Sequence, residues 1–189
     1  MVRRSQCMLL ALLVGGLLIC PAFAAPLFPD VNGYEEFAES VAYVNEAGIM
    51  VGDDRGNFNP HKTVTRAEMA TIVCRMLSED KDLVTSTQFT DVPAGHWANG
   101  YISKAASLGI VNGYGEEKFG PSDNVTYEQA VTMIVRTLGG ESEARTLGSY
   151  PDGYLLLADE NGVLDGVSAK KGEPLSRADI AIIICNCMG

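Results

Sequence analysis

Basic residues are scarce in this sequence. Its 189 residues include 14 Lys and Arg against 24 Asp and Glu, which gives a formal net charge of -10 at pH 7. A protein that binds nucleic acid or an anionic membrane through its overall charge needs the opposite balance. We therefore expect no nucleic-acid partner, and we expect a local basic pocket to hold any anionic ligand.

Long hydrophobic runs are also missing, apart from one near the N-terminus. Arg3 and Arg4 precede an apolar run over 8–20, and Ala22-Phe23-Ala24 follows with the small residues that signal peptidase recognises. The run is too short to cross a bilayer comfortably. We therefore predict a signal peptide over 1–24, an exported product and no membrane span in the mature chain.

Cysteine is too sparse for a disulfide framework. Only Cys74, Cys185 and Cys187 follow the predicted cleavage site, and Cys-x-Cys is not the spacing of a zinc ribbon or a thioredoxin-like site. One interpretation is that these cysteines pack as small hydrophobic residues. The alternative is a Cys74–Cys185 disulfide, because both residues stand at the same position in two of the repeats described below.

Motifs for catalysis, metal binding and cofactor binding are missing as well. The sequence has two histidines, no His-Glu-x-x-His motif and no glycine-rich phosphate loop. The acidic stretch at 53–57 does not fit a calcium loop, because Arg55 occupies a ligand position and the closing Glu is absent. We therefore predict that the protein is not an enzyme and carries no metal or cofactor.

The sequence does contain an internal repeat. Ten positions in its first half recur 61 residues later with the same or a similar residue. They are Phe28, Asp30, Val31, Gly48, Ile49, Gly52, Phe58, Pro60, Val64 and Thr65, which recur as Phe89, Asp91, Val92, Gly109, Ile110, Gly113, Phe119, Pro121, Val125 and Thr126. A shorter third copy begins at Tyr150-Pro151-Asp152. The repeats therefore span 28–78, 89–139 and 150–189, with polar linkers between them.

Each repeat is typical of a helix, a loop and a second helix. The first helix ends at a glycine that suits a left-handed cap, namely Gly48, Gly109 or Gly162. The second helix opens with a capping box, as at 65–68, and is apolar over most of its circumference. Three equivalent buried helices predict an all-α fold, in which helix-loop-helix repeats form a pseudo-threefold assembly around a central three-helix bundle.

These residues resemble the S-layer homology (SLH) repeat. The middle copy carries the ordered motifs of that family at 89–92, 96–98, 109–113 and 119–121, and Thr65-Arg66-Ala67-Glu68 matches its signature tetrad. The resemblance covers about 28–189. It implies a pseudo-trimer of repeats that binds, without a covalent bond, the secondary cell-wall polysaccharide of bacteria, often a pyruvylated polymer. It also implies that the sugar lies in grooves between adjacent repeats and that the tetrad arginine is a principal ligand.

The arginine of the tetrad is unusual on physical grounds too. Arg66 and Arg177 stand in the first turn of their helices, where the positive end of the helix dipole disfavours a cation. A guanidinium fork that binds a carboxylate of the glycan is one explanation. An ion pair with an acidic residue of a neighbouring repeat is the other.

The remaining candidate positions depart from the family pattern or have more than one interpretation. Trp97 either stacks on a sugar ring or belongs to the core of its repeat. Tyr127 replaces the arginine in the middle copy, so its ring can stack on sugar but offers no charge, and we expect one groove to be weaker. Asp30, Asp91 and Asp152 open their repeats and either form a turn or line a groove.

The sequence as a whole predicts an anchoring module of the bacterial cell wall or cell surface. The predicted partner is an acidic secondary cell-wall polysaccharide, with S-layer or other surface proteins as further candidates. Two alternatives remain. One is a structural or interaction protein of the cell surface that binds no glycan, and the other is the anchoring fragment of a larger surface enzyme or S-layer protein.

Overall fold

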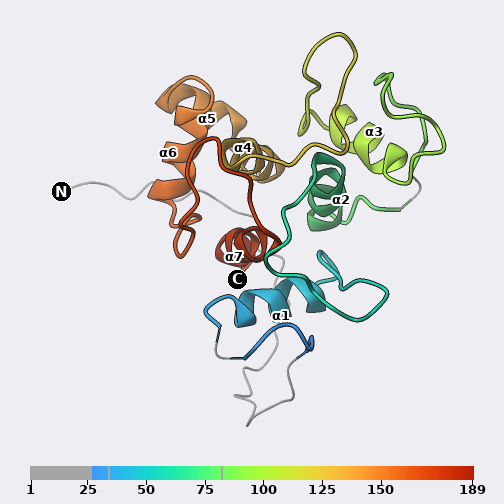
Figure 1. Cartoon of the computed structure of the whole chain (residues 1–189). Helices are drawn as coiled ribbons and strands as arrows, with labels where there is room; N and C mark the ends of the chain where they lie inside the picture. Colours follow the sequence, from blue (N-terminus) through green and yellow to red (C-terminus); the bar gives the residue numbers. More distant parts are fainter. Residues whose placement is uncertain (1–26, 34, 82) are drawn as a thin grey trace.

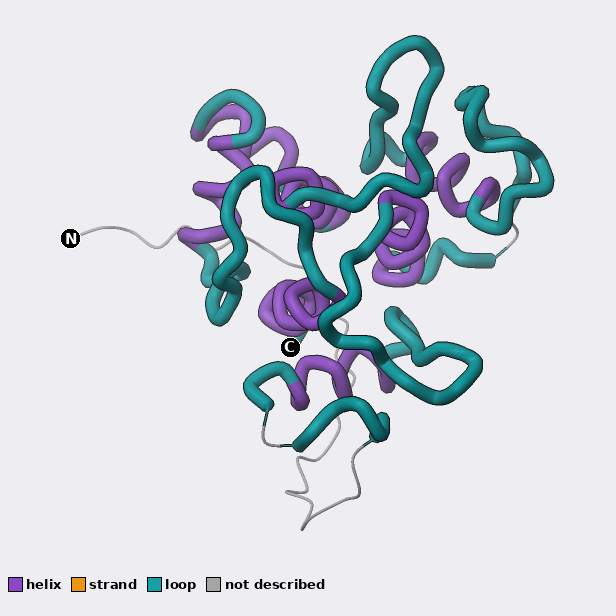
Figure 2. Tube along the Cα trace, viewed as in Figure 1, coloured by secondary structure: helices purple, strands orange, loops and turns teal. Residues whose placement is uncertain are grey.

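The computed structural model describes residues 27–33, 35–81 and 83–189, and it is helical (Figure 1). The predicted signal peptide at 1–24 lies outside these residues. The helices are α1 (Ala38–Glu46), α2 (Arg66–Met76), α3 (Asn99–Ser107), α4 (Tyr127–Thr137), α5 (Glu141–Leu147), α6 (Asp152–Glu160) and α7 (Arg177–Met188). Within the described ranges the loops form isolated β-bridges and no named strand (Figure 2). The prediction of an all-α fold is confirmed.

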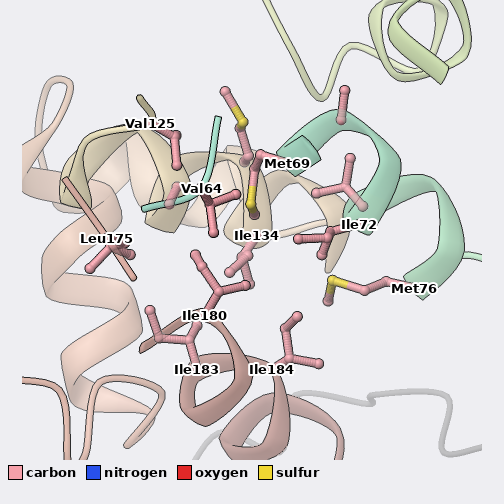
Figure 3. Close-up of a cluster of buried hydrophobic side chains, with 14 of the residues drawn as sticks. Val64, Met69, Ile72, Met76, Val125, Ile134, Leu175, Ile180, Ile183 and Ile184 are labelled. Atoms are coloured by element: carbon pink, nitrogen blue, oxygen red, sulfur yellow. The ribbon is translucent and has the colours of Figure 1, made fainter. Parts of the chain in front are cut away.

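A bundle of α2, α4 and α7 forms the centre of the molecule. Figure 1 looks roughly along these three helices, with α1, α3 and the α5–α6 pair arranged around them. Large aliphatic side chains from all three helices fill the space between them (Figure 3). Met69, Ile134, Ile180 and Ile183 are fully buried. None of the described helices has the length and the apolar character that a membrane crossing requires.

A ring of backbone hydrogen bonds closes the assembly just before the central helices. The amide of Val64 donates to the carbonyl of Leu175 (3.0 Å), the amide of Leu175 donates to Val125 (3.2 Å), and the amide of Val125 donates to Val64 (2.8 Å). Each repeat therefore donates one bond and accepts one. Buried backbone groups need partners, and here each repeat can find its partner only on another repeat.

The first helix of each repeat packs against the second helix of a different repeat. Helix α3 packs on α2, α6 packs on α4, and α1 packs on α7, which closes the circle. The hydroxyl of Tyr43 on α1 donates to the carbonyl of Met188 on α7 at 2.9 Å. Each outer helix therefore packs on a central helix of another repeat and not on that of its own.

The helix ends agree with the sequence pattern. Gly48, Gly109 and Gly162 have φ values of 71°, 72° and 72°, so they are the left-handed caps that were predicted. In the first tetrad, the Glu68 amide donates to the Thr65 hydroxyl (3.2 Å) and the Thr65 amide donates to the Glu68 carboxylate (2.8 Å). These bonds satisfy amides at the start of α2 that have no partner inside the helix.

The loops between the two helices of a repeat are held by phenylalanine and aspartate. Phe28 packs on Phe58, and Phe89 packs on Phe119, with ring centroids 5.3 and 5.2 Å apart. A Cβ atom on Gly52 would lie 2.7 Å from the Phe28 ring, and one on Gly113 would lie 2.6 Å from the Phe89 ring. These contacts explain why the second glycine of the loop recurs together with the first phenylalanine.

The aspartates expected to form a turn or line a groove have different roles. The carboxylate of Asp30 accepts from the amides of Phe58 (2.8 Å) and Asn59 (2.7 Å), and Asp91 accepts from Phe119 (2.9 Å) and Gly120 (2.8 Å). Both therefore fix the loop that precedes the tetrad. Asp152 lies in the first turn of α6 and pairs with Lys171 at 2.7 Å.

Helix α5 occupies the segment that was expected to be a polar linker. Glu141 and Arg145 are one helical turn apart and form an ion pair at 2.7 Å, which favours a helix. The Glu141 carboxylate also accepts from the Tyr154 hydroxyl on α6 at 2.7 Å. This polar pair and the packing of α5 on α6 hold a short helix that has little apolar periodicity of its own.

All three described cysteines are free, so the alternative of a Cys74–Cys185 disulfide is not borne out. Cys74 on α2 donates to the carbonyl of Tyr101 on α3 (3.5 Å), and Cys185 on α7 lies beside Tyr43 of α1. These positions face the outer helices rather than the threefold axis, which keeps the two thiols apart. Burial raises the pKa of Cys187 to about 12, so this thiol is also sequestered.

Candidate functional site: two arginine grooves

A cavity of about 260 Å³, here called the Arg66 groove, lies where the first two repeats meet. Its walls come from the N-terminus of α2, the 110–114 loop, helix α4 and Tyr150, which precedes α6. The lining residues are Arg66, Ile110, Asn112, Gly113, Tyr114, Gln129, Thr132, Met133, Arg136 and Tyr150. The groove therefore lies between two adjacent repeats, the first and the second, and also takes Tyr150 from the start of the third.

Arg66 is held in this groove by neutral groups. Its Nε atom donates to the carbonyl of Phe119 (2.8 Å) and its Nη2 atom donates to the carbonyl of Asn112 (2.7 Å). The guanidinium also lies 4.3 Å from the centroid of the Tyr114 ring and 4.6 Å from that of Phe119. Only 3% of the residue is exposed.

A second cavity of about 140 Å³, here called the Arg177 groove, lies where the third repeat meets the first. Arg177 donates from Nε to the carbonyl of Phe58 and from Nη2 to the carbonyl of Val51, both at 2.7 Å. Its guanidinium lies 4.5 Å from the Phe58 ring centroid. The two tetrad arginines thus have equivalent environments, although Arg177 is only half-buried.

Neither tetrad arginine has a carboxylate partner within the described ranges. The ion pairs found there do not include Arg66 or Arg177, so the alternative of an ion pair between repeats is not borne out. Burial lowers the pKa of both guanidinium groups, while more distant carboxylates such as Asp123 and Glu68 raise it. A largely desolvated cation that has no carboxylate partner among the described residues can offer charge-assisted hydrogen bonds to an anionic ligand.

Each groove has an exposed aromatic ring at its rim. Trp97 lines the Arg177 groove and is 61% exposed, so the alternative in which it belongs to the core is wrong. Tyr150 lines the Arg66 groove and is 55% exposed. Both residues come just before the outer helix of their repeat, so Tyr150 occupies the position of Trp97. The sequence alone indicates Tyr150-Pro151-Asp152 as the start of the third repeat, with Asp152 corresponding to Asp91.

Tyr127 lines neither of the two grooves. Its amide donates to the carbonyl of Glu173 at 2.8 Å, as the amides of Arg66 and Arg177 donate to the loops of their neighbours. Burial raises the pKa of its hydroxyl, and the negative charge of Asp159 raises it further. The region around the middle tetrad therefore lacks the guanidinium group of the other two tetrads and has an acidic neighbour.

The sequence analysis missed the second arginine of each groove. Arg136 lines the Arg66 groove, and Arg75 lines the Arg177 groove. Both stand ten residues after the capping threonine, and both donate from Nη1 to the carbonyl that follows the first-helix glycine, at 3.5 Å. Their recurrence 61 residues apart was a usable signal, but the apolar residues around them obscured it. In the third repeat Asn186 holds this position.

Across 27–33, 35–81 and 83–189, no group of three or more His, Cys, Asp or Glu side chains is arranged to hold a metal ion. What the grooves offer is charge-assisted hydrogen bonding from arginine and a flat apolar surface from an aromatic ring. Those two elements suit an acidic sugar, because a sugar ring has an apolar face and its acidic group matches the guanidinium fork.

Comparisons with known proteins point in the same direction. The chain is 34% identical over 161 residues to a cell surface protein of Thermoanaerobacter kivui, covering 83% of this chain and 20% of that protein. It is 32% identical over 189 residues to the surface-layer 125 kDa protein of Lysinibacillus sphaericus, covering 92% of this chain and 16% of that protein. It is also 32% identical over 115 residues to a cellulosome-anchoring protein of Acetivibrio thermocellus, covering 59% of this chain and 26% of that protein.

The chain thus spans about a quarter or less of the length of these relatives. The profile of the S-layer homology domain matches residues 27–70 and 88–131, which include the first two tetrads and the loops before them. The repeated motifs and the similarity to surface-layer proteins agree with this match. The chain belongs to the S-layer homology family.

Proposed function

We propose that this chain is a non-catalytic anchoring module that attaches an exported protein to an acidic polysaccharide of the bacterial cell wall. The observation that carries the proposal is the pair of grooves in which a largely desolvated arginine has no carboxylate partner among the described residues and an aromatic ring stands at the rim. Membership of the S-layer homology family and similarity to a cellulosome-anchoring protein support it.

In this proposal the glycan lies across the boundary between repeats. An acidic substituent binds at Arg66 or Arg177, while a sugar ring packs on Tyr150 or Trp97. A carboxylate, including that of a pyruvate acetal, has the two oxygens that a guanidinium fork binds. The third repeat, 150–189, contributes Arg177 and Tyr150, so it is part of the binding unit although the family profile does not cover it.

We further propose that the mature protein is secreted and resides at the cell wall, where S-layer or other surface proteins are candidate neighbours. The alternative of a surface protein without glycan binding would explain the bonds of the two arginines to loop carbonyls, but neither the unpaired charge of these desolvated groups nor the two exposed aromatic rings beside them. For this reason we place glycan binding first.

The test is co-sedimentation of the protein with purified cell walls, before and after chemical removal of the wall polysaccharide. The double variant Trp97→Ala, Tyr150→Ala removes the aromatic ring at the rim of each groove. It should bind intact walls at least tenfold more weakly, because truncating a stacked aromatic ring costs more than about 1 kcal/mol. The matched control is Leu108→Ala, which truncates an exposed residue at the other end of α3.

Binding that persists after the polysaccharide is removed would favour the alternative of a protein partner. Equal binding by the double variant and the control would show that the grooves do not contact the wall. Thermal melting of each variant is the check on folding, and both should melt within a few degrees of the parent because the truncated side chains are exposed.

A further inference from the structure

Each groove contains a tetrad arginine and a second arginine from the central helix, but the second arginine is held differently in the two grooves. Arg66 faces Arg136 in one groove, and Arg177 faces Arg75 in the other. The tetrad arginines are fixed by equivalent bonds to two backbone carbonyls. One difference between the grooves lies with Arg136 and Arg75.

Asn112 connects both arginines of the Arg66 groove. Its backbone carbonyl accepts from Nη2 of Arg66 at 2.7 Å. Its side-chain oxygen accepts from Nη1 of Arg136 at 3.1 Å, in the amide orientation in which its nitrogen donates to the carbonyl of Val111 at 3.2 Å. This orientation is the one that satisfies both ends of the amide. Glu141 holds Arg136 from the other side, accepting from its Nε at 2.8 Å.

Val51 occupies the position of Asn112 in the Arg177 groove. Its carbonyl accepts from Arg177, but its isopropyl group offers no acceptor to Arg75. The bond that Arg75 makes is a long one, to the carbonyl of Ile49 at 3.5 Å, and none of the ion pairs in the described ranges includes Arg75. Arg75 is therefore left with more rotameric freedom than Arg136.

The surrounding charges and polar groups also differ. The carboxylate of Glu68 lines the Arg177 groove, where the Arg66 groove has the neutral amide of Gln129. Glu141 offsets part of the charge of Arg136, but Arg145 binds the same carboxylate at 2.7 Å, so the three groups together remain cationic. The buried hydroxyl of Thr132 lines the Arg66 groove without a partner in the described ranges.

We propose that the Arg66 groove is the tighter site for the carboxylate of the wall glycan, and that Asn112 is the positioning residue that sets this difference. The inference rests on the proposed function. Its physical basis is preorganisation: two guanidinium groups already held in place lose less conformational entropy when the anion binds than a pair with one mobile member. The Nη1 group of Arg66, which has no hydrogen bond within the described ranges, and the side-chain amide of Gln129 complete the set of donors.

The test uses reciprocal exchange of one residue. Isothermal titration calorimetry with soluble polysaccharide fragments released from cell walls should resolve two unequal sites in the parent protein. Asn112→Val should weaken the tighter site by about tenfold, since a hydrogen bond to a charged group is lost. Val51→Asn should strengthen the weaker site, because it supplies Arg75 with the missing acceptor.

One further measurement separates positioning from a general structural role. Fragments with their carboxyl groups reduced to alcohols should bind the parent and Asn112→Val equally, because the variant affects only the recognition of the anion. If Asn112→Val fails to fold, the affinity of Val51→Asn for the fragments is sufficient to test the inference. A gain in affinity cannot result from a loss of structure.

Parent protein that binds no fragment at all would overturn both the proposed function and this inference. Parent protein that binds at two sites, with affinities that neither exchange alters, would overturn the inference alone. Two equivalent sites in the parent protein would also overturn the inference alone.

Discussion

At the scale of single residues, the two tetrad arginines are equivalent in hydrogen bonding but not in exposure. Arg66 lies under the Tyr114 ring, whereas the repeat-1 position that corresponds to Tyr114 is Asp53, which bonds instead to its own loop. Arg177 is consequently half-buried.

Replacing these arginines should therefore have unequal effects on stability. Arg66→Ala removes the donor of a buried bond to the Phe119 carbonyl and of a part-buried bond to the Asn112 carbonyl, and it should lower the free energy of unfolding by about 2 kcal/mol or more. Arg177→Ala should cost about 1 kcal/mol, because water can reach the carbonyls that it exposes. Urea denaturation of the two variants measures the difference. Equal losses would mean that the cover provided by Tyr114 has no energetic effect.

At the scale of an element, helix α5 depends on one carboxylate. Glu141 accepts from Arg136 on α4, Arg145 on its own helix and Tyr154 on α6. Burial acts to raise the pKa of this carboxyl, but the three hydrogen bonds outweigh it and lower the pKa to about 2. A small polar cluster therefore fixes both α5 and the second arginine of the Arg66 groove.

The stability that Glu141 contributes should depend on pH. Because its pKa is lower in the folded state, its contribution is present above the unfolded pKa of about 4.3 and is lost as the pH falls toward about 2. Glu141→Gln should therefore melt at a lower temperature than the parent at pH 7, and the difference should shrink steadily between about pH 4.3 and about pH 2.5. Glu160→Gln, which alters an exposed carboxylate on α6, is the control and should show no such convergence.

At the scale of the whole molecule, the repeats are interlocked. Each outer helix packs on a central helix of another repeat, and the ring through Val64, Val125 and Leu175 needs all three strands of chain. Both grooves also take residues from different repeats. Folding and ligand binding should therefore be properties of the trio and not of a single repeat.

Removing the third repeat should release the first helix. In a chain that ends at Gly148, α1 loses the face of α7 on which it packs, and hydrogen exchange of its amides should become at least tenfold faster than in the full chain. Mass spectrometry of exchanged peptides provides the measurement. A separate peptide covering 149–189 should restore protection when added in excess. Protection of α1 that survives the truncation would show that its packing on α7 contributes little.

Much of the fold was predictable because its signals are local. The capping residues of α2, α4 and α7 and the glycines that end the first helices each act within about four residues of themselves. The 61-residue period then indicated that the helices are equivalent and that their apolar surfaces are buried together. Helix α5 was not predictable in this way, since its stability comes from contacts with α4 and α6 rather than from its own pattern.

The sequence by itself therefore determined the helices, their ends, the repeat and the tetrad arginines, because each depends on short-range geometry that the residue types encode directly. The tertiary structure alone decided which outer helix pairs with which central helix, and that Cys74 and Cys185 face outward. It also decided that Arg136 lies beside Arg66 and that Tyr150 takes the place of Trp97. These outcomes depend on contacts between distant parts of the chain. Such contacts form only when several repeats bury their apolar faces at once, so no single segment carries a signal for them.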